Sequence, residues 1–225
     1  EEVGRTAFPS PLIATLSATF VLNACDSPAA TAALSEIAGG KATALALTNI
    51  DGEWDSAATG VRVNADGRLD GLAAFVQDAR KCAQFIVSAQ SDAGVGLYLV
   101  SAAAEGLTLT PDSIIDLTRD QARLTFEKVD AIELAAPGTG SAAIDAALPG
   151  LLCLVAADMV GAGEWLLQTT VEYAKTRVQF DRPLGFFQAV KHPLVNVMLQ
   201  IDNAKSLAYN AACAIDHDPA EALRL

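Results

Sequence analysis

The sequence predicts an α+β fold in which N-terminal helices precede a β-domain and a C-terminal helical bundle follows it. Three observations support this prediction. Apolar residues recur at three-to-four spacing within residues 1–40. The period drops to two within residues 41–136, where turn signals separate short apolar runs. Helical spacing returns within residues 137–225, after a boundary rich in proline and glycine.

Residues 1–40 contain the end of an N-terminal helical domain. Helix-compatible spacing covers Leu12–Leu22 and again Pro28–Ile37. The second helix starts with Ser27, a capping residue followed by a first-turn proline, and it stops at Gly39-Gly40. We therefore expect two consecutive helices before the β-domain.

Residues 41–136 are predicted to form the middle β-domain. A hairpin turn is expected at Asp66-Gly67, and Leu69 resumes the chain after it. Short strands separated by turn signals indicate an antiparallel β-barrel or sandwich. The strands are expected at residues 43–47, 61–64, 85–87, 95–100, 107–110 and 123–129.

Residues 137–225 are predicted to begin the C-terminal helical bundle. One long helix is expected from about Ser141 to Thr176, and Pro183 breaks the pattern. A second helix follows to about Ala214, with Pro193 either starting it or kinking it. The sequence both begins and ends inside a helical region, so we expect a fold that is incomplete at both ends.

Composition and charge exclude several classes of partner. The net charge is -12 and the 15 Lys and Arg are scattered, which argues against nucleic acid. No run approaches the roughly 20 apolar residues of a membrane helix, so no membrane is expected. The chain opens with Glu1-Glu2 rather than a basic and apolar signal, which favours a cytoplasmic location. The four cysteines lie far apart, so we expect free buried thiols and no metal site.

No self-contained catalytic motif is present. The sequence lacks a P-loop, a G-x-S-x-G elbow, a dinucleotide-binding G-x-G-x-x-G after a strand, and H-E-x-x-H. His192 stands before a proline at the start of a helix, where exposure or hydrogen bonding is more common than catalysis. Catalytic residues therefore cannot be assigned from motifs.

The segment from Tyr173 to Gln188 has an unusual composition. Arg177 offers a planar fork that suits a pyrophosphate. Phe180 and Phe187 offer surfaces for a flat ring, and the two glutamines can hydrogen-bond a heterocycle. The alternative is a corner between two helices, with Arg177 capping carbonyls and both phenylalanines in the core. Residue chemistry alone leaves both interpretations open.

The same segment resembles the Y-x-x-x-R-x-Q-F-G-x-P-I-x-x-F-Q signature of the acyl-CoA dehydrogenases. Asp181 replaces its glycine and Leu184 its isoleucine. Looser resemblances cover most of the chain: residues 1–5 resemble E-E-L-G-R, residues 44–48 resemble the start of A-L-T-E-P, and residues 71–76 resemble G-x-K-x-(W/F)-(I/V). The segment is highly specific for the family, whereas the other three motifs are not.

The resemblance implies an FAD-dependent enzyme that desaturates the α,β bond of an acyl-CoA thioester, in fatty acid or steroid side-chain degradation. It implies that Arg177 reaches the FAD pyrophosphate of a neighbouring subunit, and hence a homo- or hetero-oligomer, a dimer or tetramer. An electron-transferring flavoprotein would accept the electrons. The other residues that would line the cofactor are Gln179, Phe180, Leu184, Phe187 and Gln188 from the same corner, with Leu47, Thr48, Phe75 and Val76 from the β-domain.

Three departures from the family pattern affect this interpretation. The family has T-E-P-x-A-G-S-D after the first strand, but Glu53 and Trp54 replace its glycine and serine. A carboxylate there would repel a pyrophosphate, and an indole would fill the ligand's space. Gln77 replaces the family's Thr or Ser at the flavin ring. The catalytic glutamate is missing too, because Leu151 stands where one branch of the family carries it.

Three hypotheses remain open at this point. The chain is the non-catalytic partner in a heteromeric enzyme, donating its corner to FAD held by a sister subunit. Alternatively, it belongs to a homotetrameric enzyme whose catalytic base lies outside this stretch. The third hypothesis is a flavin-free subunit that binds acyl-CoA or serves assembly. We assign no catalytic residue under any of them.

Overall fold

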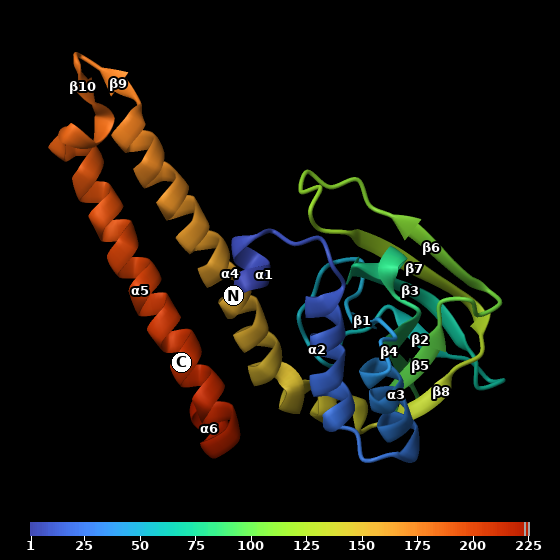
Figure 1. Ribbon diagram of the computed structural model, residues 1–225. Helices are drawn as coiled ribbons and strands as arrows, with labels where there is room; N and C mark the ends of the chain where they lie inside the picture. Colours follow the sequence, from blue (N-terminus) through green and yellow to red (C-terminus); the bar gives the residue numbers. More distant parts are fainter. Residues whose placement is uncertain (223, 225) are drawn as a thin grey trace. The chain divides into compact units, whose positions relative to one another are not determined.

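A computed structural model describes residues 1–222 and 224 of the chain (Figure 1). The chain divides into two compact units. The first, here called the β-unit, is Pro9–Leu151, and the second, the helical unit, joins Glu1–Phe8 to Leu152–Leu225. The units do not coincide with the predicted segments 1–40, 41–136 and 137–225, whose boundaries stay a prediction. Each unit is described by itself.

Two helices open the β-unit, as predicted. They are α2 (Leu12–Asn23) and α3 (Pro28–Ala38). The Ser27 hydroxyl accepts a hydrogen bond from the backbone N–H of Ala30 at 3.2 Å, and Pro28 follows in the first turn. This side-chain cap satisfies one of the donors that a helix start leaves free, which explains why α3 begins there.

Eight strands of the β-unit form one sheet. Its order is β6-β7-β3-β2-β4-β5-β8, with β1 added beside β4. The α+β class is therefore as predicted, but β1 and β2 each pair with β4 in parallel rather than antiparallel. The strands are β1 (Thr43–Ala46), β2 (Val61–Val63), β3 (Leu69–Gln77), β4 (Gln84–Ser91), β5 (Gly94–Ser101), β6 (Leu107–Pro111), β7 (Gln121–Val129) and β8 (Ile132–Ala135), with a 3-10 turn η1 (Ala79–Lys81) after β3.

The sheet is buried on both faces in its centre. Along β4, Phe85 belongs to one apolar cluster with Phe126 of β7, whereas the next residue, Ile86, belongs to another. The second cluster includes Leu97 of β5, Ile144 and residues of α2 and α3. Because side chains alternate along a strand, one strand supplies both clusters. The central strand thus holds the helices and the sheet together.

The helical unit consists of a short helix and a long helical hairpin. Helix α1 is Glu2–Arg5, and α4 is Gly140–Thr176, of which the part from Leu152 onward belongs to this unit. Helix α5 is Gln188–His217, followed by α6 (Pro219–Ala222). The predicted break at Pro183 is confirmed, because β9 (Val178–Gln179), β10 (Arg182–Pro183) and the 3-10 turn η2 (Leu184–Phe186) separate α4 from α5. Pro149 and Pro193 both lie inside helices.

Two glycines allow α1 to pack closely on α4. A side chain at Gly4 would collide with the backbone carbonyl of Asp158, and one at Gly161 would collide with that of Glu1. Since backbone atoms cannot move aside as a flexible side chain can, only glycine permits this approach. This packing explains the glycine of the Glu1–Arg5 segment.

Helix α4 is long and apolar enough to cross a membrane by length and composition, with a mean hydropathy of 1.8 in its most apolar window. No other helix among residues 1–222 and 224 meets that test. The core helices of water-soluble proteins pass it too, so it is weak evidence. The predicted absence of a membrane partner stays a prediction.

All four cysteines are free thiols. Cys25 and Cys82 are buried as predicted, whereas Cys153 is half-buried and Cys213 is exposed. Burial raises the pKa of the Cys82 thiol to about 12, and the nearby Asp78 carboxylate adds to the shift. The Cys82 thiol therefore stays protonated at neutral pH and acts as an apolar core residue.

Candidate cofactor site

The corner between α4 and α5 is a short β-hairpin. Gln179 pairs with Arg182 in antiparallel register, and Phe180 and Asp181 form the two-residue loop between them. Both loop residues have positive φ angles, 55° and 58°. Two positive φ angles in a two-residue loop are the mark of a type I′ turn. The N–H of Leu184 donates to the carbonyl of Arg177 at 2.9 Å and closes the hairpin.

Replacing Asp181 with glycine, the residue of the family signature, is expected to stabilise the protein. Asp181 holds a left-handed backbone conformation, which costs most L-residues about 1–2 kcal/mol and costs glycine nothing. Since aspartate tolerates this region better than most residues, we expect a gain of about 0.5–1 kcal/mol. Urea unfolding of Asp181→Gly measures it. Unchanged or lower stability would contradict the assigned turn.

The hairpin presents most of the predicted cofactor residues to solvent. Phe180 is 85% exposed, and Arg177 and Gln179 are exposed as well. The Arg177 side chain makes no hydrogen bond or ion pair with any of the residues that the structure describes. The alternative, in which Phe180 is buried in the core of a corner between two helices, therefore differs from the structure.

A second row of side chains supports the exposed ones. Phe187 is half-buried, and its ring lies edge-on to Phe180 at 6.2 Å between centroids and to Phe186 at 5.6 Å. Leu184 is half-buried, and Gln188 is exposed as the first residue of α5. Edge-to-face contacts of this kind fix ring orientation. The corner is an ordered aromatic surface with Arg177 at the end of α4.

Sequence reasoning missed one member of this corner. The guanidinium of Arg182 lies over the ring of Phe186, 5.4 Å from its centroid. Such a cation–π contact adds about 0.5–1 kcal/mol at an exposed site. Three residues separate the two in sequence, and the 3-10 turn η2 that follows β10 brings their side chains together. His192, by contrast, is exposed in α5, as its position before Pro193 predicted.

Four residues of the β-domain were predicted to line the cofactor. Leu47 and Thr48 follow β1, and Phe75 and Val76 lie near the end of β3. An isolated bridge joins Thr48 to Ala74, and the N–H of Ala74 donates to the Thr48 carbonyl at 2.9 Å. Leu47 is half-buried, and Phe75 is 49% exposed with a φ of 56°. The Val76 side chain is completely buried in the sheet core, so it presents no surface to a ligand. Leu47, Thr48 and Phe75 stay accessible.

The loop at residues 49–56, here called the 49–56 loop, lies where the resemblance places phosphate-binding residues. It lines a cavity of about 40 Å³, formed with the first turns of α4. Pockets for organic ligands have about 300–1,000 Å³. The lining residues are Leu47, Thr48, Glu53, Trp54, Asp55, Ser56, Ile144, Asp145 and Leu148.

The charges of this cavity oppose a dinucleotide. Glu53, Asp55 and Asp145 contribute three carboxylates to the lining, and the lining includes no lysine or arginine. A diphosphate would meet like charges in too small a space, so the residues of this pocket do not fit FAD. The corner does fit, because an exposed guanidinium and aromatic rings match a diphosphate and a flat heterocycle. The corner belongs to the helical unit and the cavity to the β-unit.

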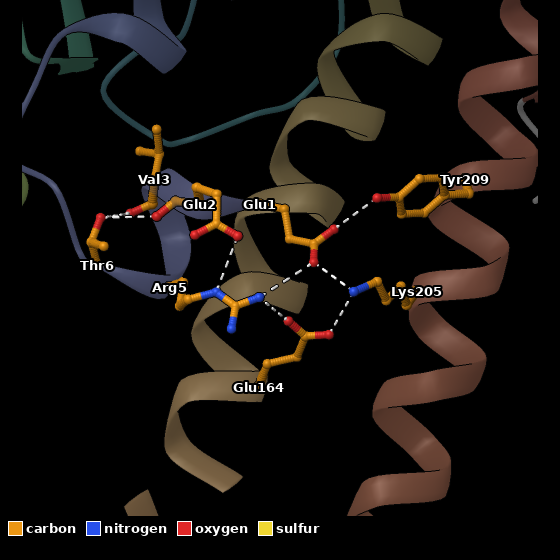
Figure 2. A network of polar contacts seen from close by, with 8 residues as sticks. All are labelled: Glu1, Glu2, Val3, Arg5, Thr6, Glu164, Lys205 and Tyr209. Atoms are coloured by element: carbon orange, nitrogen blue, oxygen red, sulfur yellow. Dashed lines mark hydrogen bonds and ion pairs between the residues drawn. The ribbon is translucent and has the colours of Figure 1, made fainter. Parts of the chain in front are cut away.

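A network of charges in the helical unit was not predicted (Figure 2). The Lys205 ammonium bonds Glu1 at 2.6 Å and Glu164 at 2.8 Å, and Arg5 bonds Glu164 at 2.7 Å. The hydrogen bond from Lys205 lowers the pKa of Glu1, and the same bond raises that of Lys205. Tyr209 also donates to Glu1 at 3.2 Å. The network ties α1, α4 and α5 together, so its role is structural.

No catalytic base emerges from the described residues. Leu151, at the position where one family branch carries glutamate, is buried. Asp145 lines the small cavity. Asp158 lies in α4, and its backbone packs against Gly4 of α1. The structure thus leaves the catalytic assignment empty, as the sequence did.

Comparison with known proteins agrees with the geometry of the fold. Residues 138–224 match the family model for the acyl-CoA dehydrogenase C-terminal domain. Acyl-CoA dehydrogenase IpdE2 of Mycobacterium tuberculosis is 33% identical over 95% of this chain and 54% of its own length. A short-chain-specific acyl-CoA dehydrogenase of Megasphaera elsdenii is 32% identical over 79% of this chain and 50% of its own length. The chain spans about half the length of these curated relatives.

Solved structures show the same fold. A variant of the Tcur3481-Tcur3483 steroid ACAD superposes with a TM-score of 0.84 and 30% identity, over 98% of this chain and 60% of that one. Butyryl-CoA dehydrogenase from Megasphaera elsdenii gives a TM-score of 0.81 and 28% identity, over 90% of this chain and 57% of that one. Sequence signature, family model and fold agree. Residues 138–224 carry the C-terminal domain of the acyl-CoA dehydrogenase family, and nearly the whole chain is similar to acyl-CoA dehydrogenases in sequence and fold.

Proposed function

We propose that this chain is a subunit of an FAD-dependent acyl-CoA dehydrogenase and that its corner binds FAD held by a neighbouring subunit. The observation that carries the proposal is the exposed hairpin between α4 and α5, with Arg177 unpaired among the described residues and Phe180 85% exposed. An exposed aromatic side chain beside a guanidinium that no carboxylate pairs is well suited to bind a partner.

Each corner residue has a role in this proposal. The Arg177 fork would donate to diphosphate oxygens, and Phe180, held edge-on by Phe187, would pack against a flat ring. Gln179 and Gln188 would hydrogen-bond polar atoms of the adenosine side. Leu184 is half-buried at the base of the corner and would position it. All of these groups bind and orient, and none transfers a proton.

The chemistry that FAD would supply when bound is acceptance of a hydride from the β-carbon of an acyl-CoA thioester, and an electron-transferring flavoprotein would take up the electrons. The contribution of this chain is to hold the cofactor in register at the interface. The carboxylate that takes the α-proton would come from another subunit or another part of the protein, because none of the residues that the structure describes is placed for it. A cytoplasmic location and an acyl-CoA from fatty acid or steroid side-chain degradation belong to the same proposal.

A heteromeric assembly is the form that we favour. The corner fits FAD, whereas the cavity of about 40 Å³ in the β-unit does not. A chain that offers one half of a flavin site and lacks the other needs a sister chain that supplies the missing half. The similar Tcur3481-Tcur3483 steroid ACAD is named for two components, which supports this arrangement.

Co-expression with a sister acyl-CoA dehydrogenase chain tests the proposal. We expect the full-length protein to be colourless alone and to purify in a yellow complex with the sister chain. The flavin colour of this complex should bleach on addition of a steroid side-chain CoA ester or butyryl-CoA. A yellow protein without a sister chain would instead support the homotetramer. A protein that stays colourless with every sister chain and still binds the CoA ester would support a flavin-free subunit.

A further inference from the structure

We propose that the 49–56 loop is a preformed closure that keeps FAD out of this chain's own β-unit, with Asn49 as its positioning residue and Glu53 and Trp54 as the residues that exclude the cofactor. This inference rests on the proposed function, and it states which of the two chains in the assembly holds the flavin.

Asn49 folds the loop without any ligand. Its side-chain carbonyl accepts hydrogen bonds from the backbone N–H groups of Asp51 at 3.1 Å and Glu53 at 3.2 Å. Its side-chain amide donates to the Glu53 carboxylate at 2.6 Å. One residue thus satisfies two backbone donors and fixes an acidic side chain, which is the way Asx turns order short loops.

The two ends of the loop are anchored as well. At the start, the N–H of Ala74 in β3 donates to the carbonyl of Thr48, the residue just before the loop, at 2.9 Å. At the other end, the Ser141 hydroxyl donates to the Ser56 carbonyl at 3.0 Å and joins the loop to the start of α4. The loop is therefore held on both sides of the cavity rather than free to move aside.

The anchored loop brings charge and bulk to the cavity. Glu53 lies in the lining beside Asp55 and Asp145, and Trp54 lines it too while keeping 68% of its surface exposed. A diphosphate would have to displace the indole, break the bond between Asn49 and Glu53, and lie beside three carboxylates. Each of these opposes binding, so the pocket stays closed to a dinucleotide.

Opening the loop is the direct test. Glu53→Gly combined with Trp54→Ser restores the small residues of the family pattern, and equilibrium dialysis of the full-length chain against FAD measures bound flavin by its absorbance. We expect negligible flavin on the unmodified chain and a rise in FAD affinity of about tenfold or more for the double variant. Stoichiometric FAD on the unmodified chain alone, or no gain in the folded double variant, would overturn the closure.

Two further variants keep the result interpretable. Asp51→Asn removes one negative charge from the loop outside the cavity lining, so we expect no gain in FAD binding from it. Trp54→Ser alone removes a largely exposed side chain and serves if the double variant fails to fold, with a smaller gain expected. A gain from Asp51→Asn equal to that of the double variant would overturn the assignment, because net charge would then explain it.

Adding Arg177→Ala to the double variant separates this inference from the proposed function. If both hold, the opened chain binds FAD and loses it when Arg177 is removed from the neighbouring copy. If the closure holds and the role of the corner does not, the triple variant keeps its FAD. If the closure fails, the double variant gains nothing, whatever Arg177 does.

Discussion

Replacing Arg177 with alanine is expected to strip flavin from the assembled enzyme, weakening FAD binding about 100-fold. The guanidinium is exposed just after α4, and two backbone hydrogen bonds hold the residue that carries it: Arg177 N–H to the Tyr173 carbonyl at 2.8 Å and Leu184 N–H to the Arg177 carbonyl at 2.9 Å. A planar fork can donate two parallel hydrogen bonds to a diphosphate, whereas the other guanidinium of the corner, that of Arg182, lies over the Phe186 ring. Titrating FAD into the apo complex, followed by flavin fluorescence, measures the loss.

Two matched variants define what Arg177 contributes. Arg177→Lys keeps the charge and loses the fork, so we expect it to recover only part of the affinity. Lys175→Ala removes an exposed cation two residues earlier, which is paired with Glu172 at 2.7 Å, and should leave FAD binding unchanged. If Lys175→Ala weakened FAD as much as Arg177→Ala, a general loss of positive charge would explain both results. The corner would then have no specific role.

The corner could be predicted from the sequence because its residues are close together along the chain. The signature from Tyr173 to Gln188 carries the arginine, the aromatic rings and the proline that ends the helix within one short segment. The type I′ turn at Phe180 and Asp181 was not predicted, since Phe-Asp is not among the residue pairs, such as Asn-Gly or Asp-Gly, that mark this turn. Pairing of Gln179 with Arg182 imposes that conformation, so tertiary geometry overrides local preference.

Other features could not be predicted because they join distant segments. The network of Glu1, Glu164 and Lys205 forms only once α1 has packed on α4 and α5 beside it. The parallel pairings of β4 depend on how the chain crosses the sheet, which alternation within a strand does not reveal. The role of Asn49 was missed for a different reason. The sequence marked Glu53 and Trp54 as departures from the family pattern, but the residue that orders them needed the three-dimensional structure.

Gly161→Ala is expected to lower the free energy of unfolding by about 1–3 kcal/mol, the usual cost of forcing extra volume into a packed interior. The new methyl group would meet the backbone carbonyl of Glu1 and the N–H of Arg5. In a free helix the same change favours folding by up to about 1 kcal/mol. The clash outweighs this gain because backbone atoms of α1 cannot move aside without separating the helices. Separation would also break the ion pair between Arg5 and Glu164.

Gly163→Ala, two residues further along α4, is the matched control. A methyl group there would lie 3.6 Å from the Ile201 side chain, which is ordinary van der Waals contact. The only effect left is that alanine favours a helix more than glycine does. We therefore expect Gly163→Ala to raise the free energy of unfolding by about 0.5–1 kcal/mol. Urea unfolding followed by circular dichroism measures both variants. Opposite signs at two glycines of one helix can come only from the close approach of α1, whereas stabilisation by both would show that α1 does not pack on α4.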